Sequence, residues 1–483
     1  MRAHLPILPT LLALVGALLV AALAPLRGRG ARPLAVATAV AAAAAALAGV
    51  ADVLGRGPQR YALGGWPPPW GIEAVLDPLS AFMAAAVAAV AAVALVAGPG
   101  IAALYGDSRS TFYALALVAL AGFLGIIASG DLFNVFVFLE IAAIASYALI
   151  ASGGGAGLLA AFRYLVLGTV GASFYLLGVG FIYALTGSLN MADLAARLPA
   201  LSGSPLFAAG AAFIVVGLGI KMGLFPLHGW LPDAYTHAPA PVASLLAAVA
   251  TKAAAYALAR TVLYVLRPAE LHVGTALAWA GAASIVVGGV LAVRQTDARR
   301  LLAYSSVSQM GYVALGLGLS NGPALAGAYL HVLNHAMMKA TLFLGVGALA
   351  LQGRGPALVA LRFGRRTSVV GVAMVVAALS MVGVPPAGGF FSKWYLLQGA
   401  VGAAEPVLVA AILVGSVLAL AYCYRLTEAV WFPRADDGPE PAAAPAVRLG
   451  LVALAAGILV VGLASGVIVE HLLLPAAAPA VTR

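Results

Sequence analysis

The chain has 483 residues, of which 63% are hydrophobic and only 9% are charged, whereas an ordinary soluble domain carries about 25% charged residues. A soluble fold cannot hide this much apolar surface from water, so the composition excludes a soluble globular protein and indicates one that spans a lipid bilayer. The formal net charge of +10 would suggest a nucleic-acid partner for a soluble protein. In membrane proteins, however, arginines in short loops set the topology, so we expect no nucleic-acid partner.

Hydropathy divides the chain into about fourteen apolar segments of spanning length. Each is predicted to be a helix, because lipid offers the backbone no hydrogen-bond partners. The first segment is long, lacks a clear small-residue cleavage site and precedes a second span, so we interpret it as a retained helix and not as a signal peptide. The predicted fold class is an all-α polytopic membrane protein with a single membrane-embedded domain over residues 1–483. The predicted spans are residues 5–25, 33–52, 75–103, 111–130, 131–151, 161–187, 205–227, 240–266, 271–293, 301–319, 324–351, 368–400, 405–431 and 447–471.

The arginines outside the spans predict how the chain is oriented. The span boundaries place them in two groups of loops on opposite faces, and the denser group is predicted to be cytoplasmic because Lys and Arg accumulate in cytoplasmic loops. Both termini then lie on the outer face of the cell membrane. The polar, proline-rich segment 434–448 is predicted to be a mobile cytoplasmic loop. The denser loops hold Arg27, Arg29, Arg32, Arg294, Arg299, Arg300, Arg354, Arg362, Arg365 and Arg366, and the sparser loops hold Arg56, Arg60, Arg197 and Arg267.

Two predicted spans are interrupted by proline and glycine close to a lysine. One break covers Lys221–Pro226, and the other covers Gly383–Lys393. Broken helices at matching places in two halves of a chain are typical of inverted repeats whose functional site lies at the break. Proline and glycine are also commoner in membrane helices than in soluble ones, which would explain either break alone.

Lysine is rare in this chain and is confined to the predicted spans. A charge at the centre of a membrane helix costs about 2.5–3.5 kcal/mol, so four together cost on the order of 10 kcal/mol if the costs add. Arginine stays protonated, whereas a lysine in apolar surroundings can release its proton near neutral pH. The pattern therefore predicts a proton relay at mid-membrane. The alternative is that an amine reaches the interface along its own stem. The lysines are Lys221, Lys252, Lys339 and Lys393.

Glu140 is the only carboxylate well inside the first half of the predicted spans. A carboxylate buried without a cation would be protonated, so a cationic partner is implied. Lys221 is the predicted partner, because its helix is broken nearby and can bring the amine toward the carboxylate. Separating such a pair would make Lys221 release its proton more readily, so that distance controls proton affinity. The alternative is a static pair that only orients the helices.

His331, His335 and Lys339 are spaced by four residues, which places two imidazoles and an amine on one helix face. Imidazoles titrate near neutral pH and can pass protons between waters. The alternatives are polar packing against neighbouring helices and a metal site, but further metal ligands are not found. The only cysteine, Cys423, excludes a cysteine-ligated iron–sulfur cluster. We therefore predict no metal and no cofactor.

His228 and Asp233 follow the first break, at the predicted cytoplasmic end of that helix. They are candidates for admitting protons to the relay, and capping of the loop explains them equally well.

Several motifs, spread over nearly the whole chain, give it a resemblance to a known family. With them the chain resembles the antiporter-like membrane subunits shared by Mrp-type multisubunit cation/proton antiporters, membrane-bound hydrogenases and respiratory complex I. Within this family it looks most like the D-type branch of the Mrp antiporter subunits, because of its proline-rich loop Trp66–Trp70 and its Thr251-Lys252 pair. Ala247 is a departure from the quinone-reductase branch, which often has a histidine near this position. The motifs are Gly65–Glu73, Asp77–Ser80, Asp131–Glu140, Lys221–His228, Pro239–Pro241, Thr251–Lys252, Tyr304–Gly311, Asn334–Lys339 and Gly388–Lys393.

The resemblance implies a fold and a set of roles. Two inverted five-helix repeats with broken helices are implied, which we place at about residues 111–266 and 271–431, together with flanking helices and partner membrane subunits of the same complex. The implied roles are a modulating pair, a central proton carrier, a bridge between the halves and a carrier at the second break. In that order they fall to Glu140 with Lys221, to Lys252, to His331 with His335, and to Lys393.

The expected function is that of a proton-translocating subunit of a multisubunit antiporter, which exchanges protons for Na⁺ or another monovalent cation without a redox step of its own. The alternative is the proton-pumping membrane subunit of a membrane-bound hydrogenase or NADH-quinone oxidoreductase, where buried lysines would serve equally well. A self-sufficient carrier of an organic solute is a third hypothesis. The subunits that copurify with the chain would distinguish the first two functions, and transport by the chain expressed alone would test the third.

Overall fold

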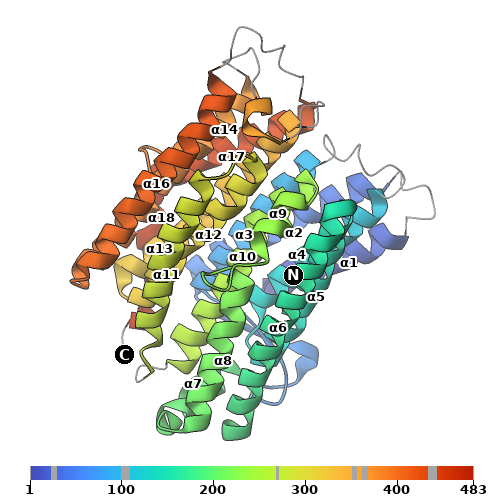
Figure 1. The fold of residues 1–483 in the computed structure, drawn as a ribbon. Helices are drawn as coiled ribbons and strands as arrows, with labels where there is room; N and C mark the ends of the chain where they lie inside the picture. Colours follow the sequence, from blue (N-terminus) through green and yellow to red (C-terminus); the bar gives the residue numbers. More distant parts are fainter. Residues whose placement is uncertain are drawn as a thin grey trace.

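The computed structural model describes residues 2–22, 30–98, 109–267, 271–350, 356–361, 368–432 and 443–481. They form a bundle of long helices whose axes are roughly aligned (Figure 1), which confirms the predicted all-α polytopic class. In the first half the elements are η1 (Arg2–His4), α1 (Leu8–Ala22), α2 (Ala31–Arg56), β1 (Gln59–Ala62), η3 (Leu63–Gly65), β2 (Glu73–Leu76), α3 (Pro78–Ala97), α4 (Arg109–Ala128), α5 (Leu132–Ala151), α6 (Gly155–Thr186), α7 (Met191–Arg197), η6 (Leu198–Leu201), α8 (Pro205–Met222), α9 (Leu231–His237), α10 (Ala240–Ala259) and the π-helical η7 (Arg260–Leu266).

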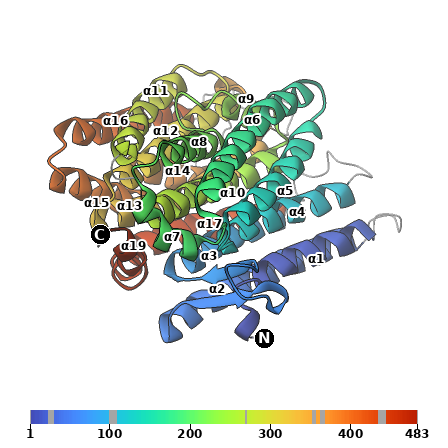
Figure 2. The same cartoon turned by 90° about the horizontal axis from the view of Figure 1, so that it is seen from below.

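The second half repeats the pattern of long helices around one interrupted helix. Its elements are α11 (Val273–Val293), α12 (Ala298–Leu319), α13 (Gly322–Ala350), η9 (Leu358–Leu361), α14 (Val369–Val382), α15 (Gly388–Gly402), α16 (Pro406–Trp431), α17 (Pro445–Leu463), α18 (Ser465–Ile468), η10 (Val469–Leu473) and α19 (Leu474–Val481). Seen from below in Figure 2, α1 and α2 lie along one edge, and α10 and α13 lie between the outer helices of the two halves.

Eleven of the described helices are long and apolar enough to cross a membrane. Three predicted spans have no counterpart among the eleven: α1 and α14 are too short, and α12 carries too many polar side chains. The predicted number of about fourteen spans therefore stays a prediction.

Two predicted boundaries differ from the structure for local reasons. The span predicted at 75–103 begins at Pro78, because Asp77 caps the helix: Asp77 Oδ1 accepts from the Ser80 amide at 2.9 Å and Ser80 Oγ accepts from the Asp77 amide at 2.8 Å. This capping box satisfies amides that the first turn leaves unpaired. The span predicted at 161–187 begins earlier, at Gly155, after Gly154 turns the chain with a φ of 63°.

The two ends of the bundle differ in what they carry. One end, which we name the terminal face, holds both described ends of the chain: Arg2 and Arg56 line one cavity there, and Arg267 donates a hydrogen bond to the Pro479 carbonyl at 2.8 Å. The terminal face is at the bottom of Figure 1, where α7 and the C-terminus lie. The other end, the opposite face, carries the described arginines of the denser predicted group, Arg32, Arg294, Arg299 and Arg300.

Part of the topology prediction lies outside the described residues. This applies to segment 434–442 of the predicted mobile loop and to six arginines, Arg27, Arg29, Arg354, Arg362, Arg365 and Arg366.

Glycines allow several helices of each half to pack with their backbones in contact. A Cβ atom on Gly217 of α8 would lie 2.5 Å from the Gly171 carbonyl of α6, and one on Gly281 of α11 would lie 2.5 Å from the Leu315 amide of α12. Helices in lipid gain little from burying apolar side chains against each other, so close approach through small residues is a main source of their association.

The two predicted helix breaks are present and have the same backbone geometry. Gly223 ends α8 and Gly383 ends α14, each with a left-handed φ, of 71° and 98°. Each glycine amide donates to the carbonyl three residues earlier, and the following amide donates to the carbonyl five residues earlier, at 3.0–3.1 Å. This double hydrogen bond is the Schellman pattern that closes a helix end at glycine. A helix resumes after each break, as α9 and as α15.

We expect Gly389→Ala to destabilise the second break. A Cβ atom there would lie 1.8 Å from the Ser380 carbonyl oxygen, and this oxygen belongs to backbone that cannot move aside without opening the break. Overpacking of this kind typically costs about 1–3 kcal/mol, so the purified complex should melt at a lower temperature. Gly402→Ala is the matched control on the same helix, because a Cβ atom meets nothing within 4 Å there. Equal melting temperatures of the two variants would contradict the contact.

Candidate functional site

Lys221 and Glu140 meet at the first helix break. Lys221 Nζ lies 3.5 Å from Glu140 Oε1 of α5, and the Lys221 side chain is only 5% exposed. Lys221 stands in the last turn of α8, where the unpaired carbonyls carry partial negative charge that favours an ammonium group. The structure thus brings together the two residues that the sequence pairs.

The end of α8 is fixed by contacts from two other elements. The Trp230 indole donates to the Ile220 carbonyl at 2.7 Å. The Phe225 amide, inside the break, donates to Ser284 Oγ of α11 at 2.9 Å. The residue next to Lys221 is therefore tied to α9, and the break itself is tied to the second half.

Lys252 is fully buried in α10 and binds only neutral oxygens. Its amine donates to the Ala247 carbonyl, five residues earlier in the chain, and lies 3.4 Å from Thr251 Oγ1. Among the lysines, all of which the structure describes, Lys221 is the only one that makes an ion pair.

His331 and His335 lie on the same face of α13, with ring centroids 6.0 Å apart and ring planes 16° apart. His331 Nδ1 is 2.9 Å from Ser392 Oγ of α15. His331 Nε2 and both ring nitrogens of His335 are buried and have no hydrogen-bond partner among the described residues. Buried polar atoms are seldom left without a partner, and where protein groups do not supply one, ordered water does. The imidazoles therefore need water beside them, as proton transfer also does.

Lys339 and Lys393 hold their amines against neutral oxygens of neighbouring helices. Lys339 Nζ donates to the Leu302 carbonyl at 2.8 Å and to Ser305 Oγ, both on α12. Lys393 Nζ donates to the Met381 carbonyl at 2.8 Å, at the end of α14. Both lysines are buried, so neither amine reaches the interface along its own stem.

Lys252 of the first half and the predicted relay residues of the second half lie close enough to act on each other electrostatically. The charges of Lys252 and Lys339 act on His335, and those of Lys252 and Lys393 act on His331. The Ser244 hydroxyl of α10 donates to the Ala340 carbonyl of α13 at 3.2 Å, which holds the helices of Lys252 and the two histidines together. Lys252 of the first half thus lies close to the buried imidazoles and amines of the second half.

His228 and Asp233 lie beyond the first break, toward the opposite face. Asp233 is held between Arg163 of α6, to which it is ion-paired, and Arg300 of α12, whose Nη1 is 3.3 Å from Asp233 Oδ1. The His228 ring lies near Phe225 and Tyr304, with ring centroids 5.5 Å and 6.5 Å away. The structure therefore does not bring His228 and Asp233 into one cluster with Lys221.

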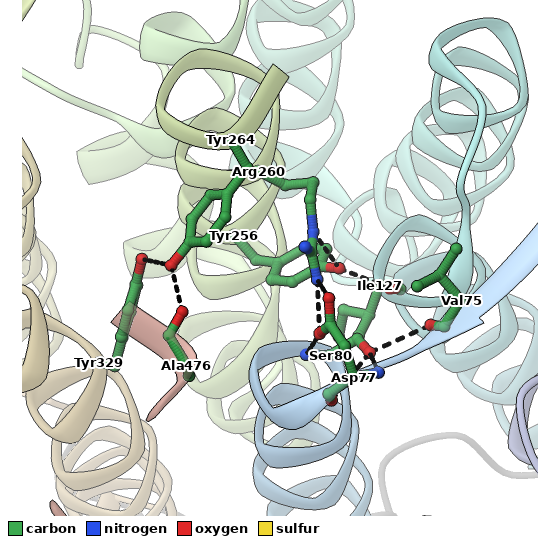
Figure 3. A network of polar contacts seen from close by, with 9 residues as sticks. All are labelled: Val75, Asp77, Ser80, Ile127, Tyr256, Arg260, Tyr264, Tyr329 and Ala476. Atoms are coloured by element: carbon green, nitrogen blue, oxygen red, sulfur yellow. Dashed lines mark hydrogen bonds and ion pairs between the residues drawn. The ribbon is translucent and has the colours of Figure 1, made fainter. Parts of the chain in front are cut away.

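A further ion pair, between the partly buried Asp77 and Arg260, was not predicted from the sequence. Figure 3 shows Arg260 between the rings of Tyr256 and Tyr264 and aimed at Asp77, whose Oδ atoms lie 2.6 Å from Arg260 Nη2. Arg260 lies inside the predicted span 240–266. Arg260 is a charged residue inside an apolar segment, so the criterion that selected the lysines also applies to it.

The Asp77 carboxyl lies outside the spans, immediately before α3. Burial by itself would raise its pKa, but the Arg260 guanidinium and the Ser80 amide together hold the pKa of Asp77 below its ordinary value. The pair is therefore charged at neutral pH as long as its members stay together.

Comparison with known proteins identifies the family to which this arrangement belongs. The model of the family described as "NADH:quinone oxidoreductase/Mrp antiporter, TM" matches residues 129–419, which include both breaks and all four lysines. The chain belongs to this family. The resemblance found in the sequence motifs is thereby confirmed, and the chain is a multi-pass membrane protein of the NADH:quinone oxidoreductase/Mrp antiporter family.

Relatives in this family include proteins named as oxidoreductase subunits and proteins named as antiporter subunits. The chain is 46% identical, over 98% of both chains, to a protein of Desulforudis audaxviator (strain MP104C) named as the N subunit of an NADH-quinone oxidoreductase. It is 30% identical, over 81% of this chain and 80% of the relative, to a protein of Bacillus subtilis (strain 168) named as the D subunit of a Na(+)/H(+) antiporter.

Solved structures of similar chains come from multisubunit membrane complexes. One is a chain of the Mrp complex from Dietzia sp. DQ12-45-1b, with a TM-score of 0.89 and 26% identity over 99% of this chain and 97% of that one. Another is a chain of the membrane-bound sulfane sulfur reductase, an archaeal respiratory membrane complex, with a TM-score of 0.92 and 30% identity over 99% and 98%. The family fold is thus shared over nearly the whole chain.

Proposed function

We propose that this chain is the proton-translocating subunit of a multisubunit monovalent cation/proton antiporter that exchanges H⁺ for Na⁺ or another alkali cation. The observation that carries the proposal is the ion pair of Lys221 with Glu140 at a helix break, continued by a row of buried amines and imidazoles. The Na(+)/H(+) antiporter protein of Bacillus subtilis and the Mrp complex of Dietzia are among the proteins that the chain resembles.

The partners of the lysines support proton transfer along this row. A carboxylate partner holds a lysine charged, because it favours the ammonium form. Carbonyl and hydroxyl oxygens accept a hydrogen bond from either form of the amine, so Lys252, Lys339 and Lys393 can be charged or neutral without losing their contacts. Only Lys221 has a carboxylate partner, and moving Glu140 away would release its proton.

The proposed relay follows from these partners. Separation of Glu140 from Lys221 sends a proton from the first break to Lys252, and His335 with His331 passes it through water to Lys393 at the second break. Lys339 lies beside this path on the helix of the histidines. His228 and Asp233 are proposed to admit protons from the opposite face, where they lie between the break and that face.

We also propose an orientation of the chain in the membrane and a division into two inverted repeats. The opposite face carries the denser arginine loops, so it faces the cytoplasm by the positive-inside rule, and the terminal face with both chain termini faces outward across the cell membrane. The shared hydrogen-bond pattern of the two breaks, at Gly223 and Gly383, supports inverted repeats at about residues 111–266 and 271–431 within a single domain.

A second candidate function has a specific observation in its favour. The relative that is 46% identical over 98% of both chains is named as part of an NADH-quinone oxidoreductase, and this function would make the chain a proton-pumping, non-redox subunit of an oxidoreductase complex. The same lysine row would serve in that complex.

Copurification after mild solubilisation distinguishes the two functions. We expect the antiporter to copurify with small membrane subunits alone, and its vesicles to exchange protons for Na⁺ when a pH gradient is imposed without any electron donor. Iron–sulfur and dehydrogenase or hydrogenase subunits in the purified complex, with proton movement only during electron transfer, would overturn the antiporter proposal in favour of the oxidoreductase.

A further inference from the structure

We propose that a cavity at the terminal face is a proton port for the first half of the chain and that the Asp77–Arg260 ion pair is its gate. The inference rests on the proposed proton-relay function, and it adds a route between Lys252 and the water at the terminal face.

The cavity is large and lies between elements that are distant in the sequence. Its volume is about 500 Å³, and its walls come from the β1–β2 hairpin, α7, η7 and the start of α19. Water occupies about 30 Å³ per molecule in the liquid, so the cavity has room for a cluster of water molecules. Asp77 and Arg260 line it, and α19 forms part of its wall, where the Tyr264 hydroxyl donates to the Ala476 carbonyl at 2.8 Å.

A polar stripe joins this cavity to the middle of the membrane. Lys252, Tyr256, Arg260 and Tyr264 are spaced by four residues along α10 and η7, a spacing that keeps side chains on one helix face. The stripe is also linked by hydrogen bonds, since Arg260 Nε donates to the Tyr256 hydroxyl at 3.2 Å and Arg260 Nη2 donates to Asp77 at 2.6 Å. The buried lysine therefore stands at the inner end of a row that ends at Asp77.

Along this stripe, the space for water narrows between the cavity and the interior of the bundle. Tyr256 and Tyr329 line a void of only about 10 Å³, no more than a single water molecule requires. Leu79 lines both this void and the large cavity, so its side chain separates the two spaces. The described structure is thus the closed state of the port.

The chemistry of the pair suits a gate for protons. Arginine does not release its proton, so Asp77 is the member of the pair that can carry one. While the pair is intact the carboxylate is held charged. When Arg260 moves away, Asp77 takes a proton that a water molecule received from the Lys252 ammonium, and then gives this proton to water in the cavity. Lys252 regains a proton from Lys221, at the first break.

The other charges around the cavity argue for protons and against an alkali cation. Glu73 is already bound by Arg60 at 3.1 Å and by Asn190 at 2.9 Å, and Arg267 adds a further guanidinium group to the wall. Both carboxylates among the described residues of the wall face arginines, so this part of the cavity offers no free negative site for Na⁺. Protons need no such site, because they move along water and hydrogen bonds.

The first test uses Asp77→Asn in the whole complex reconstituted in vesicles. Asparagine keeps the size of the side chain and an oxygen that caps α3, but it cannot accept a proton from water. We expect proton/cation exchange to fall by about tenfold or more, the effect of removing a proton-transfer group, and Asp77→Glu to restore part of it. Glu73→Gln is the matched control in the same cavity and should exchange at the wild-type rate.

Exchange by Asp77→Asn at the wild-type rate, or an equal loss in Glu73→Gln, would overturn the port. A loss of exchange caused by misassembly is recognised by the subunit composition of the purified complex. If Lys221→Ala abolishes exchange and Asp77→Asn does not, only the port is refuted; if Lys221→Ala also exchanges normally, the proposed relay function itself fails.

The second test measures water access and does not depend on transport. In a Cys423→Ser background, Ala195→Cys on the cavity wall should react with a membrane-impermeant cationic thiol reagent added on the terminal face. Ala255→Cys, at the void beyond the pair, should react slowly at rest and faster when a pH gradient drives exchange. An unreactive Ala195→Cys, or an Ala255→Cys whose rate does not change, would contradict the gate.

Discussion

Replacing Lys221 or Glu140 with alanine is expected to abolish proton/cation exchange in vesicles that carry the whole complex. Lys221→Ala removes the amine at the first break, and Glu140→Ala removes the carboxylate that lies 3.5 Å from it. Without the pair, separation of the two groups can no longer control proton release. A fully assembled variant that exchanges at the normal rate would refute the relay at its first step.

Lys221→Arg tests whether the pair needs only the positive charge of Lys221 or also the ability of Lys221 to release its proton. Arginine keeps the positive charge and can bind Glu140, but it does not give up a proton at accessible pH. We therefore expect Lys221→Arg to assemble normally and still to lose exchange by about tenfold or more. Normal exchange would mean that the pair only orients helices. Arg197→Ala is the control, because it removes one member of an exposed ion pair with Asp193 and should leave exchange unchanged.

Replacing Lys252 with methionine is expected to abolish exchange without lowering the thermal stability of the complex. Lys252 is fully buried and binds only neutral oxygens, and a charge at a helix centre costs about 2.5–3.5 kcal/mol. Methionine fills a similar volume without this cost, so the complex should melt at the same or a higher temperature. Exchange should nevertheless be lost, because the central carrier is missing.

Thermal melting and vesicle exchange, measured on the same preparation, check both parts of this prediction. Ser244→Ala is the control on the same helix: it removes a buried hydroxyl that binds the Ala340 carbonyl but no proton carrier, and it should keep exchange. A methionine variant that exchanges like the wild type would remove Lys252 from the relay. A variant that melts far lower would show that the amine is needed for packing.

The sequence was most informative where charge and apolar surroundings conflict. The cost of burying a charge is large enough to single out Lys252 and Lys393 without any structural information, and both are buried in the structure. The pairing of Lys221 with Glu140 could be predicted because only one carboxylate lies deep in the first half. Glycine and proline indicated the places of both breaks, since few other residues end a helix so sharply.

Other parts of the site could not be predicted, for physical reasons. Arginines were assigned to topology as a class, so Arg260 was overlooked although it lies inside a span. The contact of Lys252 with the Ala247 carbonyl joins residues five apart on one helix, and it depends on the rotamer of the lysine side chain, which the sequence does not reveal. Asp233 has two guanidinium partners, Arg163 and Arg300, that stand 70 and 67 residues away in the sequence, and only the fold brings them together.

The partial exposure of Glu140 indicates that the chain needs a neighbouring polypeptide to be active. Its side chain is 29% exposed, and Phe133, Val137 and Ile144 of the same helix are exposed apolar residues on the flank of the bundle. A carboxylate facing hydrocarbon would be neutralised, and the attraction that holds Lys221 charged would vanish with it. If the pair is the first step of the proposed relay, this step needs a neighbouring polypeptide that lies against α5 and keeps lipid away. We therefore expect an isolated chain in a bilayer to be inert even if perfectly folded.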